Sequence, residues 1–227
     1  MVGNRFILTF HGIGDPPSEV SDSEAQYWIG TGLFQSIVDL FQRMNTRYQL
    51  SLTFDDGNKS DYEIAFPRLA RAGLSATFFV LAGKIGHPHF LSAGQIAEMA
   101  SAGMTIGLHG MDHLDWTRAS DSVLDRELRD ARSAIARHIG RPVQEVAIPF
   151  GRYDNRVIRR LDVENFSDVY TSDGGMRLIN GRVKARYSVR RDTDVVQLER
   201  RIQNAFGVRQ RLIAEGQFRL KSARLTI

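Results

Sequence analysis

The chain has 227 residues, of which 42% are hydrophobic and 25% are charged, and it contains no cysteine. This length suits one sizeable core, so we expect a single domain over residues 1–227. The lack of cysteine excludes disulfides and thiolate metal ligands, so any metal must be held by histidine and carboxylate side chains.

Charge is distributed unevenly along the sequence. Residues 1–140 carry 12 basic and 16 acidic side chains (net −4), and residues 141–227 carry 18 and 10 (net +8). The basic C-terminal third could make peripheral contact with an anionic glycan or a membrane, or it could be a solvated arginine-rich surface. We expect no nucleic-acid partner, because the sequence has no recognised binding module.

The N-terminal residues have a short apolar run without an extended hydrophobic region or a small-residue cleavage site. This pattern is typical of a first strand rather than of a signal peptide. The chain also lacks a run of about 20 apolar residues that could span a bilayer. A cytoplasmic protein is therefore expected.

Strand-like and helix-like segments alternate along the chain, each marked by its hydrophobic periodicity and by glycine or capping residues at its ends. We predict strands at residues 5–11, 48–54, 74–81, 104–109, 143–150, 168–172 and 185–189. Helices are predicted at residues 31–47, 61–72, 92–103, 121–139, 155–165 and 194–206, with Ser60 as a cap of the second.

This alternation indicates an α/β fold with a largely parallel sheet. Seven to eight such units that close on themselves form a (β/α) barrel, whose working residues lie at the carboxyl ends of the strands. An open doubly wound sheet is the competing architecture, but it would need a glycine-rich phosphate loop. The segment at residues 11–17, HGIGDPP, lacks the third glycine of such a loop, so the barrel is favoured.

Two adjacent carboxylates, Asp55 and Asp56, follow the predicted strand at 48–54. Neighbouring side chains of an extended segment point in different directions, so one carboxylate could bind a metal while the other acts as a base. An Asp-Asp-Gly turn without catalytic function is the simpler alternative.

A pair of histidines, His109 and His113, follows the predicted strand at 104–109. Together with Asp56 they would form a set of two histidines and one carboxylate that leaves open positions for water and substrate. Such a set is typical of a catalytic metal site rather than a structural one. Trp116 could stack on a sugar ring or pack in the core, and Asp112 could orient one of the histidines.

These motifs resemble the polysaccharide deacetylase family, which is also called the NodB-homology domain. The signatures of that family are TFDDG, His-x-x-x-His and Arg-x-Pro-x-Gly, and they correspond here to residues 53–57, 109–113 and 147–151. The resemblance extends over about residues 6–189. It implies a deformed (β/α) barrel and a divalent metal, most often zinc, that serves to remove N-acetyl groups from amino sugars.

The resemblance also implies a role for each matching residue. Asp56, His109 and His113 would be the metal ligands, and Asp55 would be the general base. The backbone N–H of Phe150 would join the metal in binding the oxyanion. These roles agree with the chemistry of water activation by a divalent ion and proton transfer to a free carboxylate.

The sequence departs from the family pattern at two places. Ala147 stands where the family usually has an arginine that orients the catalytic aspartate, and the late Leu-x-His motif that normally supplies the general acid is absent. His11, at the end of the first strand, is the candidate for this acid, because the first and last strands of a closed barrel are neighbours. A hydrogen-bonded structural histidine is the alternative. The missing positive charge could come from Arg152, Arg186 or Arg190.

The expected function is therefore metal-dependent removal of N-acetyl groups from an amino sugar of a glycan or glycan precursor. Hydrolysis of a small non-peptide amide on the same scaffold is one alternative. A catalytically inactive descendant that binds glycan is another.

Overall fold

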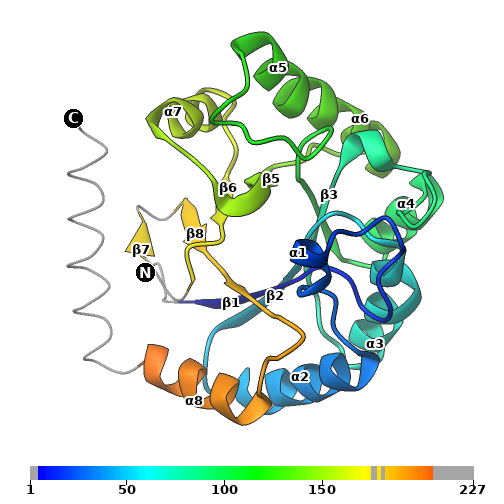
Figure 1. Ribbon diagram of the computed structural model, residues 1–227, viewed down its shortest axis with the longest axis vertical. Coiled ribbons are helices and arrows are strands. Elements are labelled where there is room, and N and C mark those ends of the chain that lie inside the picture. The colour runs from blue at the N-terminus through cyan, green and yellow to red at the C-terminus, as the bar shows by residue number, and fades with distance from the viewer. Residues whose placement is uncertain (1–4, 175–177, 180–181, 207–227) are drawn as a thin grey trace.

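The computed structural model of the protein describes residues 5–174, 178–179 and 182–206, and Figure 1 shows most of its helices in an arc around a central set of strands. The strands are β1 (Phe6–Phe10), β2 (Leu50–Phe54), β3 (Thr77–Val80), β4 (Thr105–Leu108), β5 (Glu145–Ala147), β6 (Asp168–Thr171), β7 (Leu178–Ile179), β8 (Val183–Ala185) and β9 (Tyr187–Ser188). The α-helices are α1 (Asp22–Ala25), α2 (Thr31–Met44), α3 (Phe66–Arg71), α4 (Ala93–Ser101), α5 (Asp121–Asp125), α6 (Ala131–Ile139), α7 (Asn155–Val163) and α8 (Val195–Ala205).

Four shorter helical turns complete the described elements. Two are π-helical, η1 (Asp61–Ala65) and η3 (Arg126–Asp130), and two are 3-10 turns, η2 (Ala82–Lys84) and η4 (Pro149–Gly151). Each π-helical turn interrupts a segment that the hydrophobic periodicity predicted as one regular helix. No helix in the described part of the chain is both long and apolar enough to cross a membrane.

The strands form one sheet in the order β7-β8-β6-β5-β4-β3-β2-β1-β9. All neighbours pair in parallel except β7, which is antiparallel to β8. Because β8 lies beside β6 while β9 lies beside β1, the last strands close the sheet into a nearly complete barrel. The eight strands other than β7 are therefore all parallel, which confirms the predicted (β/α) barrel.

The closing segment differs from the single strand predicted at residues 185–189. The chain changes its hydrogen-bonding partner at Arg186, whose N–H still bonds the Thr171 carbonyl of β6 at 3.1 Å. Three residues later the N–H of Val189 bonds the carbonyl of Thr9 in β1 at 2.9 Å. The predicted strand is therefore two short strands, one on each side of Arg186.

Alternation of side chains along the strands separates an outer core from the barrel interior. Outside the barrel, Phe54 stacks on Phe10 and Phe78 with ring centroids 5.1 and 4.6 Å apart, beneath α2. Inside, Ile7, Phe79, Ala147 and Tyr170 form a small apolar cluster. Gly107 leaves room for this cluster, since a Cβ there would lie 2.4 Å from the Phe79 ring.

The same alternation of side chains determines which residues face the interior at the mouth of the barrel. Thr9 of β1 pairs with Thr53 of β2, so the residues two positions later, His11 and Asp55, come side by side at the carboxyl ends. One predicted cap is wrong: Ser60 has helical backbone angles and caps nothing, and its hydroxyl instead accepts a hydrogen bond from Ile13 N–H at 3.1 Å.

Candidate metal centre and active site

The motif residues lie together at the carboxyl ends of neighbouring strands. Asp55 and Asp56 follow β2, His109 follows β4, and His113 lies four residues further on in the same loop. One nitrogen or oxygen from each of Asp56, His109 and His113 lies within 4.8 Å of the others. The structure thus brings together the three residues that the sequence predicted to share a metal ion.

The three side chains also suit a cation chemically. Asp56 Oδ1 lies 3.5 Å from His109 Nε2 and 3.7 Å from His113 Nε2, too far apart for strong hydrogen bonds. This oxygen is buried and has no hydrogen-bond partner. A buried carboxylate oxygen without a donor is costly, and a cation between it and the two imidazoles would remove that cost. The residues present therefore fit a metal site.

His109 is held in the form that a metal requires. Its Nδ1 lies 2.9 Å from the Ala147 carbonyl, which can only accept, so Nδ1 carries the proton and Nε2 keeps a free lone pair. Burial lowers the pKa of His109 to about 4, although the negative charge of Asp55 opposes this shift. The imidazole is therefore neutral near pH 7.

Two of the predicted metal ligands have unusual backbone angles. Asp56 (φ 76°) and His113 (φ 58°) both lie in the left-handed region, which residues other than glycine rarely adopt. Such conformations persist when the surrounding structure fixes them, and they are concentrated at functional sites.

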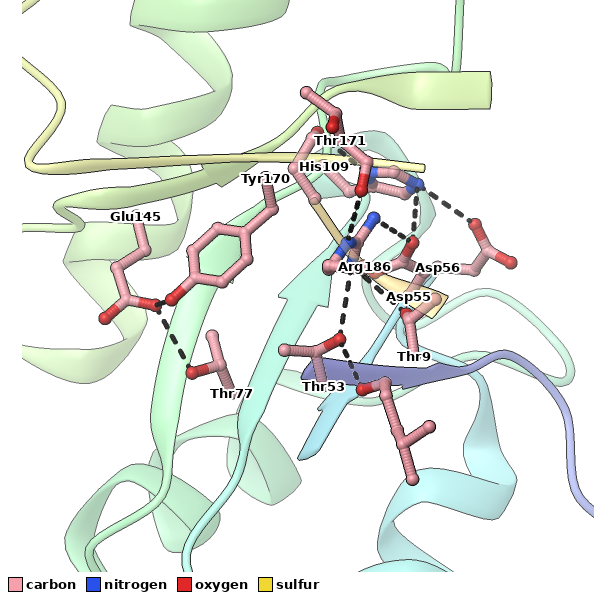
Figure 2. Close-up of polar contacts among 12 residues, drawn as sticks. Thr9, Thr53, Asp55, Asp56, Thr77, His109, Glu145, Tyr170, Thr171 and Arg186 are labelled. Atoms are coloured by element: carbon pink, nitrogen blue, oxygen red, sulfur yellow. Dashed lines mark hydrogen bonds and ion pairs between the residues drawn. The ribbon is translucent and has the colours of Figure 1, made fainter. Parts of the chain in front are cut away.

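Asp55 makes a buried, two-pronged ion pair with Arg186, and Figure 2 shows both side chains inside the barrel. The two N···O distances are 2.6 and 2.8 Å, and the side chains are 0% and 3% exposed. The other N–H groups of Arg186 donate to the hydroxyls of Thr9 and Thr53 and to the Thr171 carbonyl, at 3.1 to 3.3 Å. Each of the three guanidinium nitrogens thus has at least one acceptor.

This ion pair decides the charge of Asp55. Burial by itself would raise the pKa of Asp55, but the adjacent guanidinium of Arg186, with its hydrogen bonds, lowers it well below the usual range. Asp55 is therefore ionised. Asp61, which is buried nearby with both carboxyl oxygens lacking partners, has its pKa raised by burial and then by the charges of Asp56 and Asp55.

Of the three arginines that could replace the missing positive charge at position 147, Arg186 is the one that reaches Asp55. Arg152 instead pairs with Asp115 at 3.1 Å, and Arg190 bonds the hydroxyl of Tyr27 at 3.2 Å. The guanidinium of Arg186 lies over the rings of Phe79 and Tyr170, which belong to the same interior cluster as Ala147. The small side chain of Ala147 therefore lies in the same interior region as the Arg186 guanidinium, which comes from the segment that closes the barrel.

Phe150 lies beside the metal-ligand loop. It has a φ of 57° inside η4, is 50% exposed, and packs its ring 4.3 Å from that of His113. The amides of Gly151 and Arg152 donate to Ile148 and Pro149, whereas no hydrogen bond from the Phe150 amide is seen within the described residues. This amide is free to bind a ligand.

His11 completes the group at the strand ends. Its ring packs on Tyr27 at 4.9 Å, and its buried Nδ1 has no hydrogen-bond partner. It is close enough to Asp55 that its charge would lower the pKa of that carboxyl. The pairing of β9 with β1 also confirms the predicted adjacency of the first and last strands.

The structure decides between the two roles considered for Trp116 and corrects the one considered for Asp112. Trp116 is fully buried and donates its indole N–H to Glu127 at 3.1 Å, so it packs in the core and does not stack on a sugar. Asp112 pairs with Arg126, and its carboxylate contacts neither histidine among the described residues. Glu127 was not identified as a site residue, because a glutamate within an amphipathic helix pattern carries no signal of its own.

Removal of the Arg186 charge should destabilise the fold, because it leaves Asp55 buried and unpaired. We expect Arg186→Met to lower the free energy of unfolding by about 3–5 kcal/mol, and Arg186→Lys to lower it less, since lysine keeps the charge without the two-pronged geometry. Urea denaturation of the metal-free protein measures both. Arg118→Met, which changes an arginine whose side chain is 84% exposed, is the control and should have little effect. A wild-type midpoint for Arg186→Met would contradict this account.

Acid should weaken the metal-free protein partly through His109. The His109 side chain is protonated near pH 6.5 in the unfolded chain, but only near pH 4 in the folded state, where its pKa is lowered. The unfolded state thus binds more protons between these pH values. Lowering the pH through this window therefore reduces the free energy of unfolding by on the order of 3 kcal/mol through this residue. We expect His109→Gln to lack this component in unfolding curves from pH 7 to 4. His87→Gln, in an exposed loop, should leave the pH dependence unchanged; parallel curves for both variants would refute the assignment.

Comparison with known proteins places the chain. A family model described as polysaccharide deacetylase matches residues 43–166, which is 124 of 227 residues. The Bacillus subtilis (strain 168) protein YxkH, whose name refers to the polysaccharide deacetylases, is 29% identical over 124 residues, covering 55% of this chain and 44% of YxkH. A Staphylococcus aureus (strain MSSA476) protein named poly-beta-1,6-N-acetyl-D-glucosamine N-deacetylase is 24% identical over 114 residues, covering 44% and 39%.

The chain thus spans less than half the length of these curated relatives. Among solved structures, the Streptococcus pyogenes deacetylase PplD in complex with acetate superposes with a TM-score of 0.78 at 22% identity, over 88% of this chain and 98% of that one. This likeness supports the barrel fold. Since the family model matches more than half of the sequence, the chain belongs to the polysaccharide deacetylase family.

Proposed function

We propose that this site hydrolyses the N-acetyl group of an amino sugar in a glycan or glycan precursor. The observation that carries the proposal is a cation-ready cluster of Asp56, His109 and His113 directly beside an ionised, unligated Asp55. The name of the Staphylococcus aureus relative, which refers to poly-beta-1,6-N-acetyl-D-glucosamine, supports this class of substrate. We also propose that one catalytic domain holds the whole site, since its residues come from one sheet.

Asp56, His109 and His113 would hold the metal ion. Two imidazoles and one carboxylate are a common ligand set for zinc, and we propose zinc on that basis. When bound, a divalent ion of this kind lowers the pKa of water and polarises a carbonyl oxygen. The fixed tautomer of His109 and the unpartnered oxygen of Asp56 prepare the site for it.

Asp55 would accept the proton of the attacking water. Its carboxylate stays ionised because Arg186 holds it through two hydrogen bonds, and that hold also fixes the direction of its oxygens. The same pairing makes Asp55 a weak base, so it keeps the proton only briefly. The proton must then move on to a group that delivers it to the leaving amine.

Phe150 and His11 would serve the two ends of the breaking amide. The free N–H of Phe150 can donate to the oxygen that gains negative charge when the carbonyl is attacked. His11, on the Asp55 side of the barrel mouth, can donate a proton to the leaving nitrogen, since its ring is near Asp55 and its Nδ1 is uncommitted.

The alternatives differ in what they would require. An inactive descendant needs no general base, yet Asp55 retains a buried guanidinium partner, which favours an active enzyme. Hydrolysis of a small amide stays an alternative, which activity measurements on a panel of substrates would test.

A contact of the basic C-terminal third with anionic surfaces is less favoured, since several of its described cations already pair with carboxylates. Residues 175–177, 180–181 and 207–227 of that third lie outside the described residues.

The ligand and base roles separate in a two-part measurement. Asp56→Ala, His109→Ala and His113→Ala should each abolish stoichiometric metal binding and acetate release from N-acetylglucosamine oligomers. Asp55→Asn should bind metal at wild-type stoichiometry, with a kcat lower by about 10²- to 10⁴-fold. Asp39→Asn, in an exposed ion pair on α2, is the matched control. Full turnover by Asp55→Asn would contradict the assignment of Asp55 as the base. If the wild-type protein hydrolysed small amides but released no acetate from glycans, the small-amide alternative would replace the proposed glycan substrate.

The acid role of His11 depends on the leaving group. An amine must be protonated to leave, whereas nitrophenolate leaves unaided, so His11→Gln should lower deacetylation of a glycan by about 10²- to 10⁴-fold and change 4-nitrophenyl acetate hydrolysis only a few-fold. Steady-state kinetics with both substrates give the comparison. Equal losses on amide and ester would mean that His11 positions the site rather than donates the proton.

A further inference from the structure

The loop from Gly110 to Trp116 carries His113 and connects β4 to the helices that follow. It has to hold His113 at a φ of 58°, which costs free energy for a residue with a side chain. A loop of this kind keeps its shape only if other contacts fix its backbone. The contacts of Met111 and Asp112 show where that support comes from.

Glu127 lies directly behind this loop and is 0% exposed. Its Oε2 accepts hydrogen bonds from the Met111 amide and the Trp116 indole, each at 3.1 Å, and its Oε1 accepts one from the Asp112 amide at 3.0 Å. Within the described residues no basic side chain pairs with Glu127. The Glu127 carboxylate is therefore stabilised by hydrogen bonds from three N–H groups of the loop.

The fit between the loop and this carboxylate is close. A Cβ at Gly110 would lie 2.4 Å from Glu127 Oε2, so the loop backbone packs on the oxygen itself. Glu127 belongs to η3, the π-helical turn between α5 and α6, and such turns occur frequently at functional sites.

The opposite side of the loop is fixed as well. The amides of Ala82 and Gly83, in η2, donate to the carbonyls of Gly110 and Met111, both at 2.9 Å. The peptide groups just before His113 are thus held through their carbonyls by one neighbour and through their N–H groups by Glu127. The support from η2 consists of backbone groups, so Glu127 is the side chain on which the geometry depends.

We propose that Glu127 is a positioning residue for the metal centre: it holds the loop that presents His113 and thereby sets the affinity for the metal without touching it. This inference rests on the proposed function, since it concerns the same site. Groups that orient metal ligands from behind typically change metal affinity by about 10- to 100-fold when they are altered.

The test is Glu127→Gln in the full chain, with Co²⁺ and Zn²⁺ as probes. Glutamine keeps the size of the side chain but offers one acceptor oxygen, and its NH₂ group would face an N–H donor of the loop. We expect affinity for both ions to fall by about 10- to 100-fold in chelator competition, with a changed visible absorption spectrum of bound Co²⁺. In the metal-free protein, amide hydrogen exchange at Met111 and Asp112 should accelerate.

Glu145→Gln is the matched control. Glu145 is another largely buried carboxylate that accepts hydrogen bonds, from Tyr170 and Thr77, and Figure 2 shows it apart from the Asp55, Asp56 and His109 group. The same chemical change there should leave metal affinity and the Co²⁺ spectrum unchanged. If Glu127→Gln does not fold, Trp116→Phe removes one of the three donors and should weaken binding by a smaller factor.

The outcomes are distinguishable. A folded Glu127→Gln that binds Co²⁺ with wild-type affinity and spectrum overturns this inference and leaves the proposed function intact. Wild-type protein that binds neither ion overturns both. Equal weakening by Glu127→Gln and Glu145→Gln would overturn a specific role for Glu127, because the effect would then reflect general loss of rigidity.

Discussion

The buried pairing of Arg186 with Asp55 is the interaction on which the rest of the site depends. It places a full positive and a full negative charge inside a barrel lined by Ile7, Phe79 and Tyr170, where either charge alone would be costly. The hydroxyls of Thr9 and Thr53 in β1 and β2 accept hydrogen bonds from Arg186 Nη1, and the Thr171 carbonyl accepts one from its Nε. The Asp55 carboxylate beside the proposed metal ligands is thereby kept charged and fixed in orientation.

Side-chain parity explains how a few short strands build such a site. Every second residue of a strand points inward, so polar residues at Thr9 and Thr53 lie one layer below His11 and Asp55. The left-handed turns after the strands then redirect the chain and bring Asp56 and His113 toward the same point. The interior grades from apolar to polar along the barrel axis, with the chemistry at the polar end.

The sequence predicted the barrel and the clustering of Asp56, His109 and His113 because both depend on local patterns. Alternating periodicities identify strands and helices, and the motifs that carry Asp55, Asp56, His109 and His113 each lie within a few residues. The partner of Asp55 could not be chosen among three arginines, since that choice depends on how the last strand closes the barrel, a contact 131 residues away in sequence. Glu127 was missed because no sequence pattern marks the π-helical turn that contains it.

The place of Arg186, between the two strands that close the barrel, affects how sequence motifs of this family are recognised. The guanidinium that pairs with Asp55 comes from Arg186, in the segment that closes the barrel. A motif search that requires an arginine at position 147 would therefore classify this chain as inactive. Ala147 and the Arg186 guanidinium share one compartment with Phe79 and Tyr170, so a second arginine at position 147 would compete with Arg186 for the same space.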